Sequence, residues 1–312
     1  MAAAIGLRIY QTTITKDGEI APVKFISGDE GSDPHIFIHR YFTDPAVIIS
    51  DSDAQRSWYV TELHYADQSK RNFYGVFSYG IYGFESTIVD TKTKAAVHER
   101  QVHEAEQIPL TFQVWAPENS NWAYLSFQSF QARSCVTVVQ NAIARSFEKA
   151  HPGYRLRFQK LSPSDGRLKS LFDSNVKEVR LMKRRAPSDK TDAVSGRVKL
   201  DEANIQLVIQ APRNRILGTL SDIREKLTSK PTLDGGSVIT FQGNDYEQAA
   251  AQVLVGRKRR LVGLVGYNND AGVIDITNDV ALGKGGHPTP KSVFDESNDI
   301  LVNLHEILKK KR

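Results

Sequence analysis

The chain has 312 residues, of which 40% are hydrophobic and 25% charged, an ordinary composition for a globular protein large enough for two domains. Its single cysteine, Cys135, excludes an internal disulfide framework and any site built from several cysteines. No uncharged apolar run reaches the roughly 18 residues that span a bilayer, and the N-terminus lacks the features of a signal peptide. We therefore expect a cytoplasmic protein without direct membrane insertion.

The first half of the chain has the pattern of β-strands. Residues 35–41 alternate between apolar and polar, which is the period of a half-buried strand. In such a strand His35 and His39 point to one side of the sheet without chelating a metal. Other segments are rich in Tyr, Phe, Val and Ile or alternate loosely. These further expected strands are 5–15, 57–65, 72–89 and 122–131.

One helix and one further strand complete the first half. Ser134 is the expected N-cap of the helix, and the sequence His151-Pro152-Gly153 is expected to end it. Residues 154–160 then alternate strictly, with a basic outer face. We place a domain boundary here, which gives a β-rich assembly or sensing domain at 1–160 and a basic α+β domain at 161–312.

The second half mixes helices and strands, so the predicted fold class is α+β. Apolar positions at 216, 220, 223 and 227 predict a helix that begins near Arg213 and Arg215. A last helix is expected at 294–311. The expected strands are 176–185, 197–210 and the pair 253–266 and 273–277.

The positive charge is concentrated in the second half. Residues 1–150 hold 13 Lys and Arg against 17 Asp and Glu, whereas residues 151–312 hold 28 against 19. The whole chain has a formal net charge of +5. Such an asymmetry indicates a polyanionic partner that is held by one half of the molecule.

Four basic clusters, from separate predicted elements, are candidates for one composite phosphate-binding surface. Cations at a helix start oppose the helix dipole, and a bound phosphate would relieve this, which favours Arg213 and Arg215 as ligands. The densest cluster, 257–260, is predicted to interrupt a strand run. The terminal cluster, 309–312, is secondary because helix C-termini prefer cations for dipole reasons alone. The nucleic-acid-binding candidates are Lys183, Arg184, Arg185, Arg213, Arg215, Arg257, Lys258, Arg259 and Arg260.

No catalytic, metal or cofactor site is predicted. His35 and His39 have no Glu placed beside them as in a metalloprotease motif, and the Gly-rich stretch at 283–286 lacks the spacing of a phosphate-binding loop. Two carboxylate groups, Asp173 with Glu178 near Lys183 and Asp201 with Glu202, are the nearest approach to a nuclease centre.

The residues favour a non-enzymatic, largely sequence-nonspecific DNA-binding protein that grips phosphates, and RNA is an alternative ligand. Two other functions stay open at this point. One is a metal-dependent nuclease effector of a defence system. The other is a protein-interaction module whose basic face meets an acidic partner.

The order of elements over 120–312 resembles the RexA-like phage exclusion proteins and, more distantly, the DNA-binding subunit of Kiwa-type anti-phage systems. The resemblance is carried by the late strand pair before a charged final helix and by the segment Leu207-Val208-Ile209-Gln210-Ala211-Pro212-Arg213-Asn214-Arg215. It implies a cytoplasmic protein of an abortive-infection or exclusion system that binds DNA as a homodimer. It also implies a membrane-protein partner encoded nearby and no catalytic residue.

Overall fold

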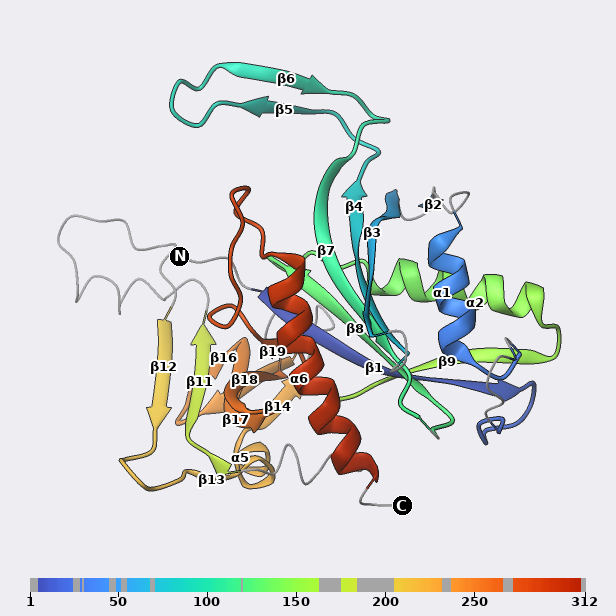
Figure 1. The fold of residues 1–312 in the computed structure, drawn as a ribbon. Helices are drawn as coiled ribbons and strands as arrows, with labels where there is room; N and C mark the ends of the chain where they lie inside the picture. The colour runs from blue at the N-terminus through green and yellow to red at the C-terminus, as the bar shows by residue number, and fades with distance from the viewer. Residues whose placement is uncertain are drawn as a thin grey trace.

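The protein has an α+β fold built on one twelve-stranded sheet whose neighbouring strands all pair antiparallel (Figure 1). The computed structural model describes residues 5–24, 29, 31–44, 49–51, 55–67, 71–118, 120–162, 175–183, 205–231, 237–265 and 272–309. The path of strands through the sheet is β12-β11-β17-β18-β19-β1-β8-β7-β4-β3-β2, and β9 pairs with β1 beside this path.

The first half supplies most of the central strands and two helices. Its elements are β1 (Ile5–Lys16), α1 (Pro34–Thr43), β2 (Ile49–Asp51), β3 (Arg56–Asp67), β4 (Asn72–Ile81), β5 (Ser86–Val89), β6 (Ala96–Arg100), β7 (Glu106–Trp115), β8 (Ala123–Phe130), α2 (Val136–Ala150) and β9 (Tyr154–Lys160).

The second half extends the sheet and ends in the longest helix of the described residues. Its elements are β10 (Asn175–Val176), β11 (Glu178–Lys183), β12 (Ile205–Gln210), β13 (Gly218–Thr219), α5 (Leu220–Lys226), β14 (Thr228–Pro231), β15 (Ser237–Phe241), β16 (Asn244–Tyr246), β17 (Gln248–Val255), β18 (Lys258–Val265), β19 (Ile274–Asp275) and α6 (Pro290–Lys309).

The sheet is covered on both faces, so most residues of the central strands β1, β4 and β8 are buried. On one face, aromatic side chains such as Phe77, Phe112 and Phe127 pack together and against α1. On the other face, α6 lies across β4, β7 and β8. There Phe294 stacks on Tyr74 with ring centroids 4.3 Å apart. Every residue of β8 is buried as a result.

The first and second halves of the chain share this sheet. β19 pairs with both β18 and β1, and the amide oxygen of Asn298 in α6 accepts hydrogen bonds from Asn72 at 2.9 Å and from Gln113 at 3.1 Å. The predicted boundary at 160 falls just after β9, and residues 163–174 lie outside the described residues. The division into two domains stays a prediction, but the last helix packs on strands of the first half.

The predicted strand at 35–41 is wrong, because these residues form α1. Pro34 occupies the first turn, where its missing N–H costs nothing, and the Asp33 side chain caps the helix by accepting from the backbone N–H of His35 at 3.0 Å. His35, Ile38 and Phe42 are all buried, which is a helical spacing. The short alternation was compatible with both periods, and the cap decided between them.

Two further predictions about the second half need correction. Residues 253–266 are not one interrupted strand: β17 and β18 form a hairpin that turns at Gly256 and Arg257, and Gly256 has φ +68°. The helix predicted from 216 begins only at Leu220. Thr219 and Asp222 form a capping box there, and this fixes the start of α5. Arg213 and Arg215 therefore lie in the loop before β13, away from a helix N-terminus.

Candidate nucleic-acid interface

Two of the four predicted basic clusters meet at one end of the sheet. β12 ends at Gln210, and the chain turns through Arg213 and Arg215 before β13. β13 pairs with β10, so that Asn175 lies opposite Thr219. At this same end, β17 turns into β18, and Figure 1 shows β13 and α5 below β11 and β12.

Hydrogen bonds to the segment 175–177 connect the two clusters. The guanidinium of Arg259 donates to the backbone carbonyl of Asn175 at 3.2 Å. The Lys177 ammonium donates to the backbone carbonyl of Arg215, while the backbone N–H of Lys177 bonds to Gln252 in β17. The side chains of Arg213, Arg215, Arg257 and Arg259 are all exposed. We call these four arginines the basic end.

Lys177 was missed by the sequence reasoning. It is a lone cation between two strands, so no cluster pointed to it. The position of its ammonium beside the Arg215 loop depends on the pairing of β10 with β13, which the sequence pattern did not reveal.

Arg260 does not belong to this exposed surface, although it lies within the densest basic run. Its side chain is 0% exposed, and its guanidinium donates to Glu296 of α6 and to the carbonyl of Val255. It also lies 3.4 Å from a carboxylate oxygen of Asp279 and 3.6 Å from one of Asp299. Arg260 is therefore not available as the predicted phosphate clamp, because its side chain is buried and its charge is already matched by partly buried carboxylates.

Lys258 and Arg257, in the same basic run, differ in whether their charge is free to bind a phosphate. The Lys258 ammonium donates to Glu296 at 2.7 Å and to Asp279 at 3.3 Å, and the hydrogen bond to Glu296 is the main reason that the pKa of Lys258 is raised. Arg257 has a side chain that is 93% exposed, with one contact to Asp299 at 3.4 Å. Arg257 can therefore reach a phosphate, whereas Lys258 is held by α6.

The remaining candidates lie elsewhere or outside the described residues. Lys183 ends β11 opposite Ile205, at the far end of this strand from Glu178 and Gln210, and it is half-buried. Five residues along a strand correspond to about 17 Å, so Lys183 is separate from the basic end. Arg184 and Arg185 lie outside the described residues, as does the tail beyond Lys309.

The carboxylates weighed for a nuclease centre are not assembled within the described part of the chain. Glu178 is paired with Arg180, and Asp173, Asp201 and Glu202 lie outside the described residues. Among the residues that the structure places, no group of three or more His, Cys, Asp or Glu side chains could hold a metal ion.

Three side chains that could carry other chemistry, His35, His39 and Cys135, are instead buried or hydrogen-bonded within the fold. Burial lowers the pKa of His35 to about 3, so this imidazole is neutral in the folded chain. His39 hydrogen-bonds to the hydroxyl of Tyr65. Burial raises the pKa of the Cys135 thiol to about 12, which keeps it protonated and unreactive.

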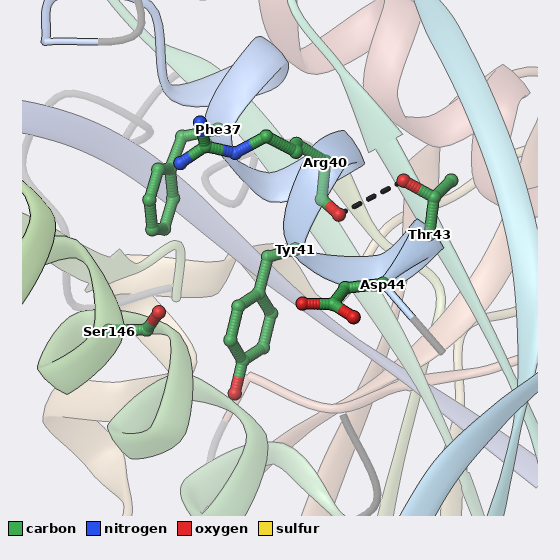
Figure 2. Close-up of a pocket in the computed structure, with 6 residues that line it drawn as sticks. All are labelled: Phe37, Arg40, Tyr41, Thr43, Asp44 and Ser146. Atoms are coloured by element: carbon green, nitrogen blue, oxygen red, sulfur yellow. Dashed lines mark hydrogen bonds between the residues drawn. The ribbon is translucent and has the colours of Figure 1, made fainter. Parts of the chain in front are cut away.

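Figure 2 shows a pocket of about 350 Å³ between α1 and α2. Arg40 and Asp44 both line it, so opposite charges face the same space. The Arg40 guanidinium lies over the Phe37 ring, and burial, with the nearby charge of Asp44, raises the pKa of Tyr41 to about 12. This pocket is on the α1 side of the sheet and lacks the excess positive charge that a polyanion requires.

A second pocket, of about 440 Å³, runs between the β17–β18 turn and α6. Three carboxylates, Asp295, Asp299 and Glu306, line it together with Arg257. A polyanion would avoid this acidic groove, so we expect a phosphate contact by Arg257 on the side of the turn away from α6.

No protein-family model and no curated protein sequence matches this chain. In the part of the chain that the structure describes, no helix is long and apolar enough to cross a membrane.

Proposed function

We propose that this chain is a non-enzymatic, largely sequence-nonspecific nucleic-acid-binding protein that grips phosphates with the basic end. The observation that carries the proposal is the meeting of two arginine pairs, Arg213 with Arg215 and Arg257 with Arg259, which are more than 40 residues apart in the sequence. Exposed guanidinium groups can each pair with two oxygens of a phosphate in a bidentate manner.

Contacts of this kind favour a phosphate backbone over any particular base sequence. Phosphate contacts position a protein on its nucleic acid but carry no direct sequence information. The basic end consists of loop and strand-end residues that present side chains outward. DNA is the proposed ligand and RNA the alternative, and the two share the backbone chemistry that the arginines recognise.

The biological setting that we propose follows the RexA-like resemblance. In it the protein acts in the cytoplasm as part of a phage exclusion or abortive-infection system, as a homodimer, with a membrane-protein partner encoded nearby. The support for this setting is the element order over 120–312 and the segment from Leu207 to Arg215. The binding proposal stands on the basic end and does not depend on the setting.

Fluorescence anisotropy with labelled duplex DNA, single-stranded DNA and RNA of one length tests the proposal. Replacing all four arginines of the basic end by Ala should weaken binding by at least about tenfold at low salt. The matched control replaces Lys16, Lys24, Lys149 and Lys284, which are exposed and lie away from the basic end, by Ala. It changes the net charge equally and should retain most of the affinity.

The control distinguishes the loss of a particular binding surface from the loss of overall positive charge. Equal loss in both variants, or no binding by the native chain at low salt, would overturn the proposal. Binding to an acidic protein without any binding to nucleic acid would instead favour the interaction-module alternative.

A further inference from the structure

The β5–β6 hairpin is an arm that stands away from the rest of the molecule (Figure 1). It forms a two-stranded sheet of its own, in which Ser86 pairs with Arg100 and Val89 with Ala96. Every residue from Phe84 to Glu99 is exposed except the half-buried Ser86. We define the arm as residues 84–104.

The arm carries an unusual amount of exposed apolar surface for such an element. Five of its side chains are 47–67% exposed, and these are Phe84, Ile88, Val89, Val97 and Val102. A lone two-stranded hairpin is only marginally stable in water, and it gains stability when its apolar side chains are covered. Clustered exposed apolar residues on a projecting element are typical of an interaction surface.

The charges along the arm indicate what covers it. The tip carries Lys92 and Lys94, while the Asp90 carboxylate there accepts from the backbone N–H of Lys92 and is used within the turn. The base of the arm carries the carboxylates of Glu85, Glu99 and Glu104, while the Arg100 cation there is buried. The arm is therefore basic at one end and acidic at the other. A second copy laid antiparallel beside it places each basic tip against an acidic base.

We propose that the arm is a self-association surface, in which two copies of this chain pair their arms antiparallel about a two-fold axis. Such an interface is isologous, so the same residues serve on both copies. Val89 and Val97 lie near the tip, at the register shift in the ladder, and would be covered on both copies. Nothing in this inference depends on nucleic-acid binding, since the arm and the basic end involve different residues.

The length of the arm limits the expected stability of the proposed dimer. Seven residues from Phe84 to Asp90 span about 20 Å in an extended strand. Two such arms bury less than the roughly 800 Å² per partner of a standard interface, so the dimer should dissociate on dilution.

Charge reversal at the two ends provides a specific test. One variant carries Lys92→Glu with Lys94→Glu, so its tip is acidic like its base; the other carries Glu85→Lys with Glu99→Lys, so its base has a net positive charge like its tip. In an antiparallel pair, like charges then face each other in each homodimer. Self-association of each variant, measured by light scattering over a dilution series, should weaken by at least about tenfold.

Mixing the two variants should restore association, because in the mixed dimer each tip meets a base of opposite charge. Native mass spectrometry would report the mixed dimer directly. A third variant replaces residues 84–104 by a short turn, since Ile81 of β4 already pairs with Glu106 of β7, and it should be monomeric. Circular dichroism checks that all three variants are folded.

Three outcomes would overturn the proposal. These are a native chain that is monomeric at every concentration, reversed variants that dimerise like the native chain, and a folded armless variant that still dimerises. Each can occur while nucleic-acid binding is intact, so this inference and the proposed function are tested separately.

Discussion

Replacing Arg260 by Met should destabilise the fold without removing a phosphate contact. The native guanidinium is fully buried and faces Glu296, which is 13% exposed, and Asp279 and Asp299, each 22% exposed. Removing one partner of a buried ion pair costs about 3–5 kcal/mol, because the remaining charge stays desolvated. We expect about 3 kcal/mol, at the lower end, since Lys258 still neutralises part of the carboxylate charge.

For a chain of 312 residues, with an unfolding entropy of about 2.1 cal/mol/K per residue, that loss should lower Tm by roughly 5 °C. Thermal and urea unfolding followed by circular dichroism measure it, with Arg259→Ala as the exposed control, for which a change within about 0.5 kcal/mol is expected. Combining Arg260→Met with Glu296→Gln should cost less than the sum of the two single changes, by about 1–3 kcal/mol, since the two side chains are in contact.

The substitution of Arg260 should leave nucleic-acid binding unchanged. Arg260→Met, at a temperature where it is folded, should bind nucleic acid with the native salt dependence. A variant that melts like the native chain but binds as weakly as Arg257→Ala with Arg259→Ala would refute the assignment of Arg260 to the interior.

Three other predictions concern salt, pH and backbone conformation. If each arginine of the basic end contacts one phosphate, the native affinity for DNA should fall about 150-fold between 50 and 200 mM salt. The affinity of the double variant Arg213→Ala with Arg215→Ala should fall only about 12-fold over the same range. Equal salt dependence of the two proteins, measured by fluorescence anisotropy, would argue against the assignment. Because the pKa of His35 is lowered from 6.5 in the unfolded chain to about 3 in the fold, stability should be lost as pH falls below 6.5. By pH 5 this amounts to about 2 kcal/mol, and urea unfolding of His35→Gln should show a correspondingly smaller loss. Gly256→Ala should cost about 1–2 kcal/mol, because φ is +68° and the new Cβ would collide with the Asp299 carboxylate; an unchanged urea midpoint would contradict the described turn.

Period-2 alternation predicted several strands well, because each of them lies in a sheet with its two faces in different surroundings. Residues 154–160 form β9, and the core of the 197–210 prediction forms β12, in which half-buried and exposed residues alternate. The α+β class followed from such segments together with the final helix. The segment 35–41 was assigned wrongly because seven residues satisfy both periods, and the Asp33 cap with Pro34 was overlooked.

The charge asymmetry was a property of the sequence by itself, as were the four basic clusters and the lack of a disulfide framework. Which arginines are exposed was decided only by the tertiary structure, because it depends on which carboxylates fold against them. The packing of α6 on the β17–β18 hairpin places Glu296 and Asp299 next to Arg260, and these residues are more than 35 positions apart. The same long-range pairing, of β10 with β13 and beside β17, brought Arg215 and Arg259 to one end of the sheet. A local sequence pattern shows where the cations are but not which distant carboxylates will lie beside them. Those distant partners determine whether a cation stabilises the fold or faces solvent.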